Sequence, residues 1–193
     1  MKLVLLLLAA TLSAQQSPVR ILVAYHSDTG HTAKLAEAVR KGAAGVDGVA
    51  VILKKDSDVS DAEIPSYDGI AFGAPVHWQS VAADGKRFLD RIAAAFTAAK
   101  LNGDGRIAGV FCTAGATSSG KDLTRLEMIA AFLAMRFTIV GGVDREGFGT
   151  LGPQATTGPG APGVDAAAEA EGRALGERLA RLTKLSRGGS VKR

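Results

Sequence analysis

A chain of 193 residues, 47% hydrophobic and 22% charged, can bury one substantial core and has room for one α/β domain, so a second independent domain is not expected. The net charge of +4 and the pI near 9.4 come without lysine and arginine blocks interleaved with aromatics, which argues against a nucleic-acid partner. The basic excess lies near the end of the chain and predicts a solvated helix face followed by a basic tail over 187–193. The basic residues concerned are Arg173, Arg178, Arg181, Lys184, Arg187, Lys192 and Arg193.

Residues 1–16, "MKLVLLLLAATLSAQQ", have the layout of a secretory signal. A lysine is followed by an apolar run too short to span a bilayer, and then by small and polar residues. We therefore expect cleavage after Ala14, export to the periplasm or the medium, and no stable membrane span after removal of the signal. The alternative is an uncleaved membrane anchor.

After the signal, the chain alternates strand and helix patterns. Apolar runs predict strands over 19–25, 49–55, 67–75, 106–113 and 137–142. Helical spacing of apolar residues predicts helices over 32–44, 85–99, 122–136 and 164–185, and the glycine- and proline-rich stretch 141–163 is expected to be a long loop. Apolar strands separated by helices imply a parallel sheet covered on both faces, so we predict one doubly wound α/β domain over 17–186.

The segment "YHSDTGHT", residues 25–32, joins the first strand to the first helix. Its Asp-Thr-Gly does not predict an aspartic protease, because such enzymes need two of these loops in all-β lobes. A loop at a helix N-terminus instead offers free backbone N–H groups and the positive end of the helix dipole to an anion. Ser27, Thr29 and Thr32 add hydroxyl donors, and Gly30 permits close approach. Since no Walker-type lysine follows, the pattern favours a monophosphate without magnesium, and an ordinary helix cap is the alternative.

Several motifs resemble one family. The pattern Tyr25-x-Ser27-x-x-Gly30-x-Thr32-x-x-x-Ala36-x-x-Val39 resembles the flavodoxin signature, with Ala24 where a larger apolar residue is usual. The stretches "FGAPVHWQSVAADGKRFLDR" and "GRIAGVFCTAGATSSGKDLT" are similar to loops of the WrbA-type NAD(P)H:quinone oxidoreductases. The resemblance implies a flavodoxin-like five-stranded parallel sheet with strand order 2-1-3-4-5.

The three suggestive loops follow the first, third and fourth predicted strands, so they are expected to converge at the switch point of the sheet. In the family that this chain resembles, the first loop holds the phosphate of FMN and the other two hold its ring. Asp28 would then have to point away from the phosphate, and Trp78 would stack on or shield the ring unless it packs on its own domain. The predicted cofactor-binding residues are Ser27, Asp28, Thr29, Gly30, His31, Thr32, Pro75, Val76, His77, Trp78, Gln79, Ser80, Thr113, Ala114, Gly115 and Gly120.

The resemblance implies an FMN-dependent enzyme that passes electrons from NAD(P)H to a quinone or a similar small acceptor, with no catalytic side chain and as a homodimer or homotetramer. The basic net charge favours an enzyme over a flavodoxin-type carrier, because carriers usually dock through an acidic rim. A flavin-less exported binding protein is the third reading. Ala134 stands where the reductases have a histidine, which bears on the nicotinamide and quinone subsite. His77 stands where arginine is frequent, so it is expected either to contact the electron-rich edge of the flavin or to be an ordinary loop histidine.

Other chemistries find weaker support. A serine hydrolase of the α/β type needs a late histidine, and none follows His77. A metal site from His26, Asp28, His31 and His77 lacks a completing carboxylate cluster. The only cysteine, Cys112, has no arginine in the spacing of a phosphatase loop, so it is expected to be a small core residue.

Overall fold

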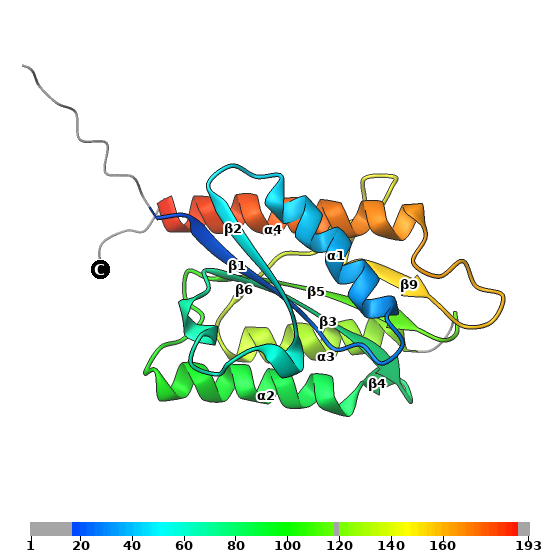
Figure 1. Cartoon of the computed structure of the whole chain (residues 1–193), viewed down its shortest axis with the longest axis horizontal. Helices are drawn as coiled ribbons and strands as arrows, with labels where there is room; N and C mark the ends of the chain where they lie inside the picture. The colour runs from blue at the N-terminus through cyan, green and yellow to red at the C-terminus, as the bar shows by residue number, and fades with distance from the viewer. Residues whose placement is uncertain (1–16, 118–119, 189–193) are drawn as a thin grey trace, which may run out of the picture.

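The computed structural model describes residues 17–117 and 120–188, so the predicted signal over 1–16 lies outside the described residues. A parallel sheet forms the centre of the molecule (Figure 1). The strand order is β2-β1-β3-β5-β6. Helices connect the main strands along the chain, as predicted. The main strands are β1 (Val19–Tyr25), β2 (Val49–Lys55), β3 (Gly69–His77) and β5 (Ile107–Ala114).

Helices cover both faces of the sheet (Figure 1). One layer contains α1 (His31–Ala44) and α4 (Ala166–Gly188), and the other contains α2 (Ala83–Ala98) and α3 (Lys121–Ala134). Two short 3-10 turns, η1 (Asp56–Asp58) and η2 (Ile64–Ser66), connect β2 to β3. The doubly wound prediction is therefore confirmed. No helix in the described ranges is both long and apolar enough to cross a membrane.

The fifth strand differs from its prediction. A single strand over 137–142 was expected, but β6 (Thr138–Ile139) pairs only with the start of β5, and β9 (Gln154–Thr156) pairs with its end. Between them, β7 (Gly142–Val143) and β8 (Gly149–Thr150) form an antiparallel hairpin. The expectation of a long loop over 141–163 was therefore wrong in part. Strand β9 gains its hydrogen bonds from β5, a partner distant in sequence that a glycine-rich local pattern does not reveal.

The buried side chain of Arg125 fixes this split strand to α3. Its guanidinium donates to the carbonyl oxygen of Gly152 and, at 3.1 Å, to the side-chain oxygen of Gln154. A buried charge with several acceptors is stable where an unpaired one is not. The insertion carrying β7 and β8 is thus anchored at the point where the chain returns to the sheet.

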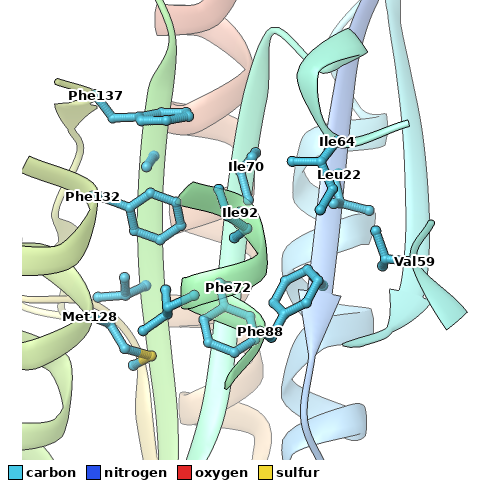
Figure 2. Packing of buried hydrophobic residues seen from close by; sticks show 14 of the residues in the cluster. Leu22, Val59, Ile64, Ile70, Phe72, Phe88, Ile92, Met128, Phe132 and Phe137 are labelled. Carbon is cyan, nitrogen blue, oxygen red and sulfur yellow. The ribbon is translucent and has the colours of Figure 1, made fainter. Parts of the chain in front are cut away.

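Apolar side chains fill the space between the sheet and each helical layer. On the side of α2 and α3, the rings of Phe72 and Phe88 lie 5.1 Å apart, with Ile92 and Met128 in the same cluster (Figure 2). Cys112 belongs to this core, and burial raises the pKa of its thiol to about 12. The prediction that Cys112 is a small core residue is confirmed, and a thiol with this pKa is not a nucleophile near neutral pH.

On the other side, α1 and α4 approach so closely that glycine is required at their contact. A Cβ atom added to Gly176 would overlap the carbonyl oxygen of Val39, and one added to Gly172 would lie 2.9 Å from the Cβ of Ala38. The end of α4 also secures the start of the domain. The Arg187 guanidinium donates to the carbonyl oxygen of Pro18 at 2.9 Å.

Replacing Gly176 should therefore test the fold. We expect Gly176→Ala to lower the free energy of unfolding by about 1–3 kcal/mol, since the added methyl must push two helices apart. Gly188→Ala in the same helix is the control, because its added Cβ has no atom within 4 Å. Urea unfolding of both variants measures the difference. Equal stabilities would contradict the close packing of α1 on α4.

Candidate functional site

Four loops meet at the carboxyl edge of the sheet. Three of them were predicted, and close backbone contacts join them. The first loop contacts β3, because His26 N–H donates to the carbonyl oxygen of Gly73 at 2.9 Å. The loop after β5 contacts the loop after β3, because a Cβ on Gly120 would lie 2.7 Å from Cα of Gln79. The fourth loop, residues 157–165, follows β9 and begins with Thr157 N–H donating to the carbonyl oxygen of Ala114 at 2.8 Å. Sequence reasoning missed this loop as part of the site because it missed β9.

The first loop leaves the start of α1 open to an anion. Gly30 is the N-cap residue with φ of 86°, and no side chain caps the helix. The first N–H groups of a helix have no partner within it, and here no acidic side chain lies in the first turn. The alternative of an ordinary side-chain cap therefore does not apply, and the helix presents N–H groups and its positive dipole end.

The three hydroxyls predicted to join these N–H groups have different positions. Ser27 Oγ accepts a hydrogen bond from Gly30 N–H at 3.1 Å, which tightens the loop. Thr32 is buried, and its Oγ1 lies 2.8 Å from Oγ1 of the equally buried Thr113. Thr29 is exposed at the loop surface. The pair of Thr32 and Thr113 thus ties the first loop to β5, and Thr29 is the hydroxyl most accessible to a ligand.

A chain of ionisable side chains connects the first loop with the loop after β3. One Asp28 oxygen lies 3.2 Å from Nε2 of His26, and the other lies 3.2 Å from Nε2 of His77. Nδ1 of the buried His26 is 2.9 Å from Oδ2 of Asp56. Each oxygen of the Asp28 carboxylate is therefore in contact with one imidazole. Over residues 17–117 and 120–188, no three such side chains have the arrangement of a metal site.

Trp78 stands at the tip of a strained hairpin. Strand β3 turns back into β4 (Ser80–Val81), with His77 paired to Ser80, so Trp78 and Gln79 are the two turn residues. Both have positive φ, 50° and 70°, in a turn position that favours asparagine and glycine. Such a conformation costs about 1–3 kcal/mol per residue. The Trp78 side chain is 99% exposed, so the alternative that it packs on its own domain is wrong.

Glu127 of α3 holds the base of this hairpin. Its carboxylate accepts hydrogen bonds from the Ser80 hydroxyl and from Val81 N–H, both at 2.9 Å. The hydroxyl of Ser80, a predicted cofactor contact, is thus directed to α3. Pro75 and Val76 are half-buried at the base of the hairpin, whereas His77 and Gln79 are exposed with Trp78.

The loop after β5 faces the hairpin from the other side. Thr113 and Ala114 are buried at the end of the strand, and Gly115 is exposed. A Cβ on Gly158 would overlap the carbonyl oxygen of Gly115, so the fourth loop packs directly against this one. The predicted site residues of this loop therefore offer backbone groups, and Gly115 leaves open space beside them.

Ala134, in contrast, lies far from these loops. It ends α3, whereas Gly120 precedes the start of that helix, and fourteen helical residues span about 20 Å. Ala134 lines a groove of about 990 Å³ between α2 and α3, together with Leu89 and Met135. The bearing of position 134 on the nicotinamide and quinone subsite stays a prediction. The groove extends from Ala134 to Ser80 and Val81 at the base of the hairpin.

A charge change at the start of α1 should separate helix stability from anion binding. We expect His31→Glu to stabilise the helix by about 0.3–1 kcal/mol through the dipole. The same charge should repel the phosphate of FMN and weaken its binding tenfold or more, about 1.4 kcal/mol. Thermal unfolding and an FMN titration measure the two effects.

Two controls accompany this change. His31→Gln removes the imidazole without adding charge, and Ala166→Glu adds the same charge to the first turn of α4. Unaltered FMN affinity in His31→Glu, or an equal loss in all three variants, would argue against an anion at α1.

A second change tests the support of the hairpin. Glu127→Ala should lower the free energy of unfolding by about 1.5–3 kcal/mol, the range for hydrogen bonds to a charged group. The anisotropy of the single tryptophan should fall as the strained turn loosens. Glu177→Ala is the control, because Glu177 pairs only with Arg181 on the exposed face of α4. The role given to Glu127 is wrong if both variants behave alike.

Comparison with known proteins connects this geometry to a family. Residues 22–137 match the family model described as Flavodoxin domain. A flavodoxin of Aquifex aeolicus is 30% identical over 130 residues, which are 66% of this chain and 68% of the relative. An NAD(P)H dehydrogenase (quinone) of Acidithiobacillus ferrooxidans is 31% identical over 144 residues, with 64% of this chain and 70% of the relative covered.

Solved structures have the same architecture. A flavodoxin, WrbA-like protein from Agrobacterium tumefaciens superposes with a TM-score of 0.69 at 22% identity, over 87% of this chain and 99% of that one. A flavodoxin from the domain Archaea has a TM-score of 0.67 at 20% identity, over 86% and 99%. The predicted flavodoxin-like fold is confirmed.

Proposed function

The chain belongs to the flavodoxin family, and we propose that it binds FMN and passes electrons from NAD(P)H to a quinone or a similar small acceptor. The observation that carries this proposal is the pairing of two features at one edge of the sheet. An uncapped helix start without acidic side chains suits a phosphate, and a fully exposed tryptophan beside it suits a flat ring.

The first loop fits the phosphate of FMN. The N–H groups at the start of α1 and the exposed hydroxyl of Thr29 are donors, and Gly30 leaves room for close approach. Neutral donors suffice for a monophosphate without magnesium. The carboxylate of Asp28, which would oppose an anion, is in contact with His26 and His77.

The hairpin and the loop after β5 fit the ring. Trp78 offers an aromatic face that is free of contacts with its own domain. Gly115 leaves open space on the facing loop, and Gly120 lets that loop pack closely against Gln79. When bound, FMN would supply the hydride and two-electron chemistry, and the protein would supply binding, orientation and electrostatics. Trp78 and Gln79 would orient the ring, and the anchoring of their turn by Glu127 would keep that orientation fixed.

A flavodoxin-type electron carrier is the second candidate. It is favoured by the relative named flavodoxin, whereas the relative named NAD(P)H dehydrogenase (quinone) favours the enzyme. The net charge of +4 supports the enzyme, because a basic protein is poorly matched to the basic partners of acidic carriers. Export to the periplasm or the medium, and assembly as a homodimer or homotetramer, belong to the same proposal.

The purified protein gives a direct test, because its only tryptophan lies at the proposed ring site. We expect FMN to quench the fluorescence of Trp78, and riboflavin, which lacks the phosphate, to bind about 100-fold more weakly, the equivalent of two charged hydrogen bonds. Stopped-flow absorbance should show reduction of the bound flavin by NADH or NADPH and its reoxidation by a soluble benzoquinone.

The possible outcomes separate the candidates. Tight FMN binding without reduction by either nucleotide would favour the carrier. Absence of FMN binding would overturn both and leave a flavin-less binding protein of the same fold.

A further inference from the structure

A second polar hollow lies beside the proposed flavin site, at the end of β2. It has a volume of about 290 Å³, and three cationic side chains contribute to its lining: Lys55, Arg87 and Arg91. The acidic side chains there are Asp56 and Asp84. The walls come from the residue that follows β1, the end of β2, η1 and α2, so the hollow lies where these elements meet.

The acidic groups of this hollow are already paired. Asp56 faces His26 at 2.9 Å and accepts a hydrogen bond from Ser57 N–H, also at 2.9 Å. Asp84 accepts one from Arg87 at 2.6 Å. Each carboxylate therefore already accepts a hydrogen bond within the protein, Asp56 from Ser57 and Asp84 from Arg87.

The cationic groups are less fully used. Arg91 binds the carbonyl oxygens of Asp56 and Val59 and the carboxylate of Asp61, so its role is to hold η1 in place. Arg87 uses one terminal nitrogen, and its side chain is 71% exposed. The ammonium group of Lys55 has no hydrogen bond or ion pair with any of the residues the structure describes. Lys55 and Arg87 thus keep donors for a ligand.

One imidazole separates this hollow from the flavin site. His26 lines the hollow, contacts Asp56 through Nδ1 and contacts Asp28 through Nε2. Asp28 in turn contacts His77, the residue before Trp78. A long ligand with one end over the Trp78 hairpin can therefore follow the exposed surface of His77 and Asp28 to Lys55.

We propose that this hollow, defined by Lys55, Ser57 and Arg87, binds the 2′-phosphate of NADPH and makes NADPH the preferred electron donor over NADH. The inference rests on the proposed function, in which a nicotinamide nucleotide reduces the flavin. A phosphate monoester is nearly dianionic at neutral pH and accepts several charge-assisted hydrogen bonds. NADH has a neutral hydroxyl at that position and gains little from two cations.

The kinetic test uses the FMN-loaded protein. We expect Lys55→Gln and Arg87→Gln each to raise KM for NADPH about tenfold, the effect of losing one charge-assisted hydrogen bond, and to leave KM for NADH within about twofold. Lys86→Gln is the matched control, because Lys86 is on α2 but pairs with Asp90 outside the hollow. FMN affinity should be the same in all of these variants. Equal changes for both nucleotides would overturn the proposal.

A binding experiment tests whether the hollow binds a phosphate, independently of enzyme turnover. Calorimetry of the FMN-loaded protein should show adenosine 2′,5′-bisphosphate binding at least tenfold more tightly than 5′-AMP, with the difference lost in Lys55→Gln. Equal affinities of the two nucleotides would refute the phosphate site. If the flavin binds but neither NADH nor NADPH reduces it, the proposed enzyme activity fails, and the calorimetric comparison still accepts or rejects the hollow as a phosphate site.

Discussion

The parallel pairing of β1, β3 and β5 is the constraint on which the rest of the site depends. In this register Tyr25 pairs with Gly73 and Pro75 pairs with Thr113, so three strands end at one edge of the sheet. Each loop that leaves the edge starts from a fully hydrogen-bonded strand and therefore has a fixed origin. The loops need little packing of their own, which leaves their polar groups and glycines available for a ligand.

Polar contacts hold the loops to one another after the sheet has fixed where each loop starts. The hydroxyl pair of Thr32 and Thr113 connects the starts of two loops beneath the surface, and Asp28 connects a third loop above it. The buried pair is shielded from solvent, whereas Asp28 and His77 are about half exposed and their attraction is weakened by water. The buried hydroxyl pair therefore holds the loops together more firmly than the exposed contact of Asp28 with His77, and the Trp78 hairpin depends on Glu127 for its anchoring.

The sequence predicts the features that depend on local pattern. Apolar runs and helical spacing located β1, β2, β3, β5 and all four helices, and the position of the loops after these strands predicted that they meet at one edge of the sheet. Features that depend on distant partners were not predictable in this way. The split of the fifth strand depends on Arg125 and on β5, and the orientation of Asp28 depends on two histidines about fifty residues apart. The positive φ of Trp78 is fixed by pairing between β3 and β4 and by Glu127, none of which a motif records.

The hydrogen bond from Arg187 to Pro18 also determines how the molecule can be tethered. It brings the first and last described residues together at the amino edge of the sheet, where β1 begins and α4 ends (Figure 1). The four loops are at the opposite edge, about one strand length away, roughly 20 Å. A partner molecule coupled chemically at residue 17 or 188 would thus be attached at the edge opposite the four loops and would leave the loop edge accessible to small molecules.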